Sequence, residues 1–95
     1  MKKRALIMND LDNVVTVLED VKKGETICFK VAGSNRTVKA IQSIARGHKI
    51  AIKTIERGEK VIKYGVPVGY AMTHIGVGEH VHVHNTASLR TEGVK

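Results

Sequence analysis

The chain has 95 residues and a formal net charge of +7, a length that fits one domain with a modest core and no deep pocket of its own. The positive charge favours anionic partners, but with only 3% aromatic residues the chain has few stacking surfaces, which argues against nucleic acid. A single cysteine excludes an internal disulfide and suits a reducing cytoplasm. No apolar run approaches the ~20 residues that a membrane span needs.

Short apolar segments separated by turn signals predict a mainly β domain with one short helix. Residues 6–8 predict the first strand. Residues 13–23 predict the helix, because Asp12 stands where an N-cap would be and Gly24 stands just beyond the end. The apolar residues between them fall on one helical face.

After Gly24 the hydrophobic periodicity changes to the alternation that is typical of strands. Apolar residues predict strands in the segments 27–31, 37–41, 50–52 and 61–63. Turns are predicted at 33–35 and 56–59, and Pro67, which lies between two glycines, predicts a tight and rigid connection. No internal repeat or linker is evident, and a loosely held polar tail is predicted at about 86–95.

The most informative motif is Gly-Glu-His-Val-His-Val-His-Asn at residues 78–85. Its alternation predicts a strand with three imidazoles on one face and the intervening valines in the core. A rise of ~3.3 Å per residue places His82 and His84 about 6.6 Å apart, so that they could bind one divalent metal ion. The same rise separates His80 from His84 by ~13 Å. The alternative interpretation is a solvated, histidine-rich edge strand.

Two further motifs carry polar groups suited to an acid. His48 and Lys49 follow a glycine at the entry to an apolar strand, where they could bind a carboxylate or transfer a proton. Taken alone, these residues also fit an ordinary surface turn. Lys63 and Tyr64 precede Gly-Val-Pro-Val-Gly, and the ammonium group and backbone amides there could hold an anion. The alternative is a structural turn in which Tyr64 packs in the core.

Together, residues 47–51 (GHKIA), 63–69 (KYGVPVG) and 78–85 (GEHVHVHN) resemble one family in their order and spacing. They are similar to the SAF-type domain of altronate and galactarate dehydratases and of the small subunit of sulfolactate sulfo-lyase. The resemblance extends from about residue 6 to residue 85. It implies a β-clip fold, a folded-over ribbon of short strands, and a single SAF-like domain over residues 1–95.

Members of this family eliminate water, or sulfite in the sulfo-lyase, from hydroxy acids. The resemblance therefore implies a small subunit or accessory domain of such a lyase, acting on an anionic sugar acid or a sulfonated hydroxy acid. The dehydratases are associated with iron(II), which implies Fe(II) or another divalent metal, shared with a large catalytic subunit and held here by His82 and His84. The implied catalytic residues are His48, His82 and His84. The implied substrate-binding residues are Lys49, Lys63, Tyr64 and Asn85.

Larger members of the family carry this domain at the start of a long polypeptide, whereas two-subunit members pair a small chain with a separate large chain. We therefore expect the isolated chain to be inactive, and to self-associate through the surface that a partner would cover. Two other classes stay open. One is a non-catalytic carbohydrate- or acid-binding module, since related SAF domains act by binding. The other is a nucleic-acid-binding module, whose affinity would fall steeply with salt.

Overall fold

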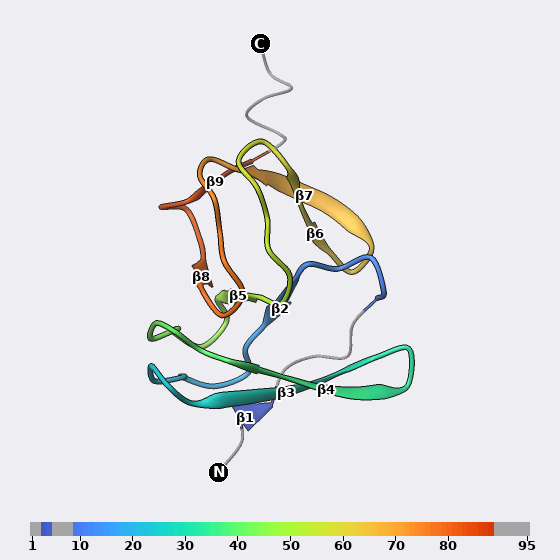
Figure 1. Cartoon of the computed structure of the whole chain (residues 1–95), viewed down its shortest axis with the longest axis vertical. Coiled ribbons are helices and arrows are strands. Elements are labelled where there is room, and N and C mark those ends of the chain that lie inside the picture. Colours follow the sequence, from blue (N-terminus) through green and yellow to red (C-terminus); the bar gives the residue numbers. More distant parts are fainter. Residues whose placement is uncertain (1–2, 5–8, 89–95) are drawn as a thin grey trace.

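The computed structural model describes residues 3–4 and 9–88. Within them, three three-stranded sheets form in the orders β1-β3-β4, β2-β5-β8 and β6-β7-β9 (Figure 1). The strands are β1 (Lys3–Arg4), β2 (Val14–Thr16), β3 (Thr26–Val31), β4 (Ser34–Lys39), β5 (Lys49–Ala51), β6 (Lys60–Lys63), β7 (Val66–Ala71), β8 (His80–Val81) and β9 (Thr86–Ser88). In this part of the chain we find no helix long and apolar enough to cross a membrane.

The predicted mainly β architecture is confirmed, and most predicted strands overlap observed ones. The expected tight connection at Pro67 is wrong, because this proline lies within β7 and pairs with Ile62 beside a register shift. The chain turns earlier, where Tyr64 and Gly65 have φ angles of 54° and 74°. The start of the predicted tail is also ordered as β9, which pairs with β7. The predicted strand at 6–8 and the tail residues 89–95 lie outside the described residues.

The predicted helix at residues 13–23 is wrong. The segment begins with β2, which pairs with β5, and continues as a turn. Val14 and Val15 are adjacent and both fully buried, so they occupy opposite faces of a strand that has a core on each side. Asp12, predicted as an N-cap, is instead a buried carboxylate that accepts hydrogen bonds from the backbone amides of Tyr64 and Gly65.

A ten-residue turn unit occurs four times, which overturns the expectation that the chain has no internal repeat. The units cover residues 17–26, 40–49, 51–60 and 71–80. Each unit has a buried valine or alanine at its first position, a buried valine or isoleucine at its fifth and a glycine at its eighth. These glycines have φ angles of 92°, 85°, 88° and 90°, a left-handed conformation that explains the residue type.

The units associate in antiparallel pairs. Val21 of the first unit bridges Ile44 of the second, and Ile55 of the third bridges Ile75 of the fourth. Each pair encloses one hairpin, β3–β4 in the first half and β6–β7 in the second. The domain therefore consists of two halves of the same construction. The repeat is hard to recognise in the sequence because only its glycine is invariant and the two hairpins differ in length.

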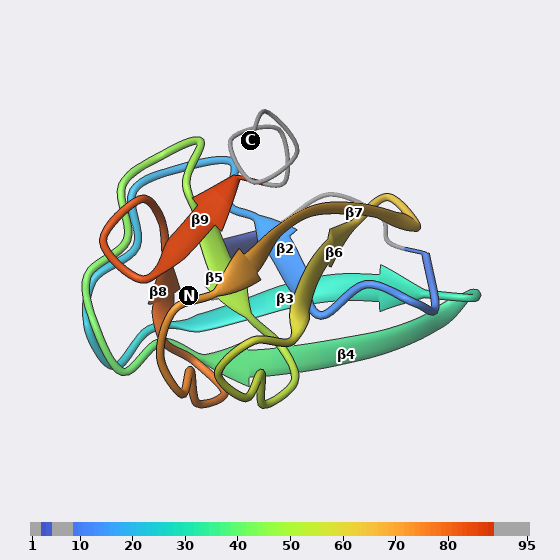
Figure 2. The ribbon, with the colours of Figure 1, turned by 90° about the horizontal axis from the view of Figure 1, so that it is seen from above.

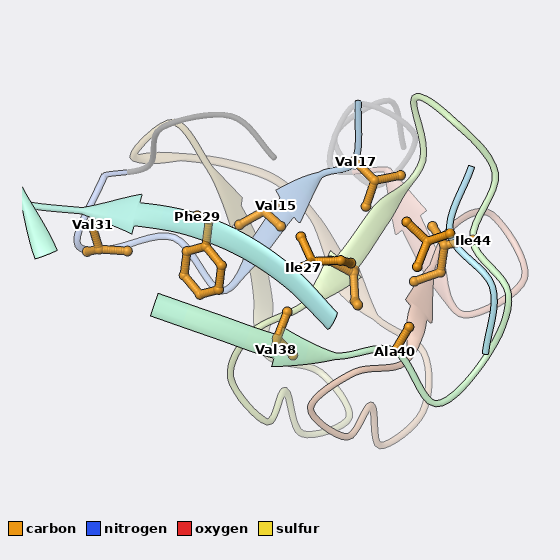
Figure 3. Packing of buried hydrophobic residues seen from close by; sticks show 10 residues of the cluster. Val15, Val17, Ile27, Phe29, Val31, Val38, Ala40 and Ile44 are labelled. Atoms are coloured by element: carbon orange, nitrogen blue, oxygen red, sulfur yellow. The ribbon is translucent and has the colours of Figure 1, made fainter. Parts of the chain in front are cut away.

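The two halves meet at the sheet β2-β5-β8, which lies between the other two sheets (Figures 1 and 2). Val15 and Ile50 belong to the hydrophobic cluster of the first half, together with residues of β3 and β4 (Figure 3). Val14, Ala51 and Val81 belong to the cluster of the second half. The central sheet thus contributes side chains to both cores. This packing fixes the positions of β5 and β8 and of the side chains that they carry.

The fourth glycine of the repeat provides a test of this close packing. A Cβ atom at Gly78 would lie 2.3 Å from the carbonyl oxygen of Lys39, whereas a Cβ atom at Gly58 would meet nothing within 4 Å. The two glycines have nearly the same φ. We expect Gly58→Ala to lower the free energy of unfolding by about 1–2 kcal/mol through the left-handed conformation alone. Gly78→Ala should lower it clearly more, and equal losses in urea titrations would contradict this account.

Candidate functional site

Three histidines from two separate parts of the chain meet beside the central sheet. Strands β5 and β8 pair antiparallel, with Ile50 opposite His80, and this brings His48 next to the β8 segment. One ring nitrogen of each of His48, His80 and His82 lies within 4.8 Å of the others. His48 Nδ1 and His80 Nε2 are 2.8 Å apart, a hydrogen-bond distance. The rings of His48 and His82 stack with centroids 3.8 Å apart. We call these three residues the histidine cluster.

The predicted straight strand through residue 84 is wrong. Strand β8 ends at Val81, and residues 82–85 form a turn in which the amides of Asn85 and Thr86 donate to the carbonyl of His82. Val83, expected in the core, is 77% exposed for this reason. The turn also folds the chain back, so that the ring centroids of His80 and His84 are 5.0 Å apart.

Asn85 holds this turn together. Its side chain is buried; Oδ1 accepts a hydrogen bond from the backbone amide of His82, and Nδ2 donates one to the carbonyl of His80. These two bonds fix the backbone between His80 and His82, which carry two of the three imidazoles of the cluster. The geometry thus makes Asn85 a positioning residue, although the sequence suggested contact with a substrate.

The cluster shares only His82 with the predicted metal pair of His82 and His84. His48 and His82, two of the predicted catalytic residues, lie next to each other with stacked rings. His80, which a straight strand would hold apart, joins them, while His84 lies beside the group with its ring tilted by 34° to that of His80. Strand periodicity could not reveal this arrangement, because it depends on where β8 ends.

The repeat singles out His48. The ninth position of the other three units is a glutamate: Glu25, Glu59 and Glu79. Each of these carboxylates accepts a hydrogen bond from the backbone amide three residues earlier in the same turn. The second unit has the same backbone turn, in which the amide of His48 donates to the carbonyl of Ala45, but it carries an imidazole. Three of the four equivalent positions thus carry a turn-stabilising carboxylate, and the remaining one carries the ring of His48, which faces two other histidines.

The surroundings favour the neutral form of two cluster members. Partial burial lowers the pKa of His80, and the charges of His84, His48 and His82 lower it further. The pKa of His82 is lowered by loss of solvent and by the charges of His48, Lys49 and His84. Neutral imidazoles keep a lone pair free for a metal ion or for a proton.

Lys49 and Lys63, two of the predicted substrate-binding residues, line one groove beside the cluster, with a volume of about 290 Å³. Lys49 is half-buried, and desolvation together with the charge of Lys63 lowers its pKa. Tyr64 does not line this groove. Its ring lies 5.1 Å from Lys63 Nζ, and the residue is about half exposed in the hairpin turn, rather than packed in the core.

Comparison with known proteins places this site in a family. Residues 3–89 match the altronate/galactarate dehydratase SAF domain. The chain belongs to this family. The resemblance that the three motifs carry is thus confirmed, and the described all-β structure of short antiparallel strands fits its β-clip fold.

Altronate dehydratase of Escherichia coli (strain K12) is 49% identical over 76 residues, which are 80% of this chain and 14% of that protein. Altronate dehydratase of Bacillus subtilis (strain 168) is 41% identical over 75 residues, with nearly the same shares. The chain thus spans only a small part of these dehydratases. The (2R)-sulfolactate sulfo-lyase subunit alpha of Chromohalobacter salexigens is 38% identical over 88 residues, which are 88% of this chain and 94% of that subunit.

The lowered pKa values of His80 and His82 predict acid sensitivity in the metal-free protein. The unfolded chain binds protons more readily at these positions, so the stability they contribute is present above their ordinary pKa of 6.5 and is lost as the pH falls below it. We expect the free energy of unfolding, measured with a chelator present, to fall between about pH 7.5 and 5.5. The fall should be smaller in a His80→Asn, His82→Asn double variant.

His74→Asn is the matched control for this titration. The hydrogen bond that His74 donates to the Glu56 carboxylate, together with the charge of Glu56, raises the pKa of His74, so this residue contributes stability at low pH rather than high. Its replacement should leave the acid sensitivity at least as large as in the parent protein. A loss of sensitivity in His74→Asn, or none in the double variant, would show that other groups are responsible.

The repeat also predicts that two substitutions at its ninth position change the free energy of unfolding by different amounts. Glu59→His removes the carboxylate that accepts from the amide of Glu56 and should cost about 1 kcal/mol of unfolding free energy. His48→Glu supplies such a carboxylate to a turn that lacks one, so it should not lower stability, although it removes one ring of the cluster. Thermal and urea unfolding measure both, and a marked loss in His48→Glu would mean that the imidazole is needed for folding.

Proposed function

We propose that this domain is the small subunit or an accessory domain of a cytoplasmic lyase that removes water or sulfite from a hydroxy acid, and that its histidine cluster holds a divalent metal ion. The observation that carries the proposal is the cluster itself: three imidazole nitrogens within 4.8 Å, in a domain of the dehydratase SAF family. The names of the relatives, altronate dehydratase and sulfolactate sulfo-lyase, supply the class of reaction.

The residues present fit a metal such as Fe(II). Imidazole is a suitable ligand for iron, zinc and nickel, and a ligand must be neutral to bind. The lowered pKa values of His80 and His82 meet this requirement near neutral pH. His48, His80 and His82 would hold the ion, which revises the predicted pair His82 and His84. A bound divalent ion would polarise a hydroxyl or carboxylate oxygen of the acid.

The chain's own residues also offer a route for a proton. His48 Nδ1 and His80 Nε2 share one hydrogen bond, and the ring of His84 lies beside His80. Elimination next to a carboxylate needs a base for the α-proton and an acid for the leaving group. Imidazole can act as either acid or base, and we propose His84 for proton transfer because it lies next to the cluster but outside it.

A large catalytic partner belongs to the proposal. The groove beside the cluster is an open hollow of about 290 Å³ and does not enclose a sugar acid. The greater part of each altronate dehydratase lies outside the segment that matches this chain. We propose that a large catalytic domain or subunit, equivalent to that part of the dehydratases, supplies the remaining catalytic groups and covers the site. We also propose that the chain self-associates when this partner is absent.

The metal proposal is tested by titrating the purified chain with Co(II) and Zn(II) and by measuring bound metal. His48→Ala, His80→Ala and His82→Ala should each weaken binding about tenfold or more, since each removes one of three ligands. His74→Ala is the control, because its imidazole pairs with Glu56 outside the cluster. Equal affinity in all four variants would remove the metal from the proposal.

The reaction is tested by complementation. The chain is added to an altronate dehydratase from which the matching segment has been deleted, and separately to the large subunit of a sulfolactate sulfo-lyase. We expect turnover of altronate or sulfolactate only in the mixture, with the chain alone inactive. Binding of the acid without restored turnover in either mixture would instead make the domain a non-catalytic acid-binding module.

A further inference from the structure

The groove beside the histidine cluster combines two cations with apolar walls. Its charged members are Lys49 on β5 and Lys63 on β6, and no acidic residue lines it. The remaining lining residues are apolar or small and come mainly from β6, β7, β8, β9 and the turn before β9: Val61, Val68, Gly69, Val81, Val83, Thr86, Ala87 and Ser88. Two ammonium groups that face apolar walls without a carboxylate are suited to an external anion, because charge attraction is stronger where water is displaced.

The groove adjoins the cluster through the backbone of β5. Lys49 follows His48 directly, and Val81, which follows His80, is paired with Lys49 in the sheet. The charge of Lys49 also acts on His82. Within the paired strands, Lys49 and Val81 project from one face and Ile50 and His80 from the other, so the groove and the cluster are neighbours across the edge of the β5–β8 pair.

The buried hydroxyl of Thr16 lies on the same sheet face as Lys49 and makes no hydrogen bond with the described residues. Thr16 lies directly opposite Lys49 in the β2–β5 pairing, so the two side chains project from the same face. The Oγ1 atom of Thr16 is buried and has no hydrogen-bond partner. Buried polar atoms are nearly always satisfied, so this hydroxyl requires a partner such as water, although Thr16 itself does not line the groove.

We propose that this groove is an anion subsite, in which Lys49 and Lys63 bind the carboxylate or sulfonate of a short hydroxy acid. The proposal rests on the proposed function for the identity of the acid. It assigns no substrate contact to Tyr64 or Asn85, which the sequence also suggested.

The shape of the groove favours a small acid over a segment of protein. Two of its lining residues pack closely, because a Cβ atom at Gly69 would lie 2.4 Å from the carbonyl oxygen of Ala87. A volume of about 290 Å³ is at the lower end of small-ligand sites and is short for a bound peptide. Val68 and Val83 at the rim are 42% and 77% exposed, and these side chains would be covered when a partner closes the groove.

The test measures acid binding to the isolated chain by NMR titration, with a chelator present so that metal does not contribute. Altronate is the carboxylate probe, sulfolactate tests the sulfonate, and altritol is the control that keeps the hydroxyl groups but lacks the anion. We expect both acids to bind and altritol not to bind. Lys49→Gln and Lys63→Gln should each raise Kd about tenfold, the usual effect of removing a charged hydrogen-bond donor.

Lys60→Gln is the matched control variant, because Lys60 is an exposed lysine on the same strand as Lys63 but does not line the groove. It should leave Kd unchanged. Equal effects of all three substitutions would indicate only a general electrostatic attraction and would overturn the subsite. Failure of both acids to bind, with lysine-dependent binding of an acidic, leucine-rich peptide, would overturn it in favour of a protein-docking groove.

The outcomes separate this inference from the proposed function. If the acids bind through the two lysines but complementation restores no turnover, the subsite stands and the lyase role fails. If turnover is restored and neither lysine substitution changes Kd or KM, the lyase role stands and the subsite is overturned.

Discussion

The structure depends on one small sheet that is buried on both faces. Strands β2, β5 and β8 are only two or three residues long, yet they send side chains alternately into two separate cores. A change in register of one residue would exchange the side chains between these cores, so the pairing is strongly specified. Because His48 stands just before β5 and His80 begins β8, the same register that joins the cores also brings the imidazoles together.

The duplicated architecture shows which side chains the fold itself needs. Four turns share a glycine with positive φ and a buried aliphatic pair, and three of them share a carboxylate that caps the turn. In the second of the four units, His48 stands at the position of that carboxylate. An exception within one chain is informative, because the other copies show what the turn would hold if stability alone decided. The exchange fits the general pattern in which functional sites depart from local structural rules.

Strand periodicity predicted much of the fold and only part of the site. Alternating Ile27, Phe29 and Val31 correctly predicted β3, because this strand has one buried face. The same reasoning failed at residues 13–23, since the adjacent buried valines of β2 contribute to two cores and match a helical face by chance. At residues 78–85, alternation correctly buried Val81 but extended the strand past its end. Asn85 ends it through hydrogen bonds that alternation does not encode.

Electrostatics gives the site its final constraint. Lys49 and Lys63 line a groove that has no carboxylate in its walls, and the three histidines of the cluster lie close to one another nearby. Loss of solvent lowers the pKa values of Lys49, His80 and His82, and repulsion from neighbouring positive groups lowers them further. A bound anion at the lysines would offset the repulsion between the charges of Lys49 and Lys63. A cation held by neutral imidazoles would need that anion nearby to limit its own repulsion with the lysines, so the two parts of the site are expected to bind their ligands cooperatively.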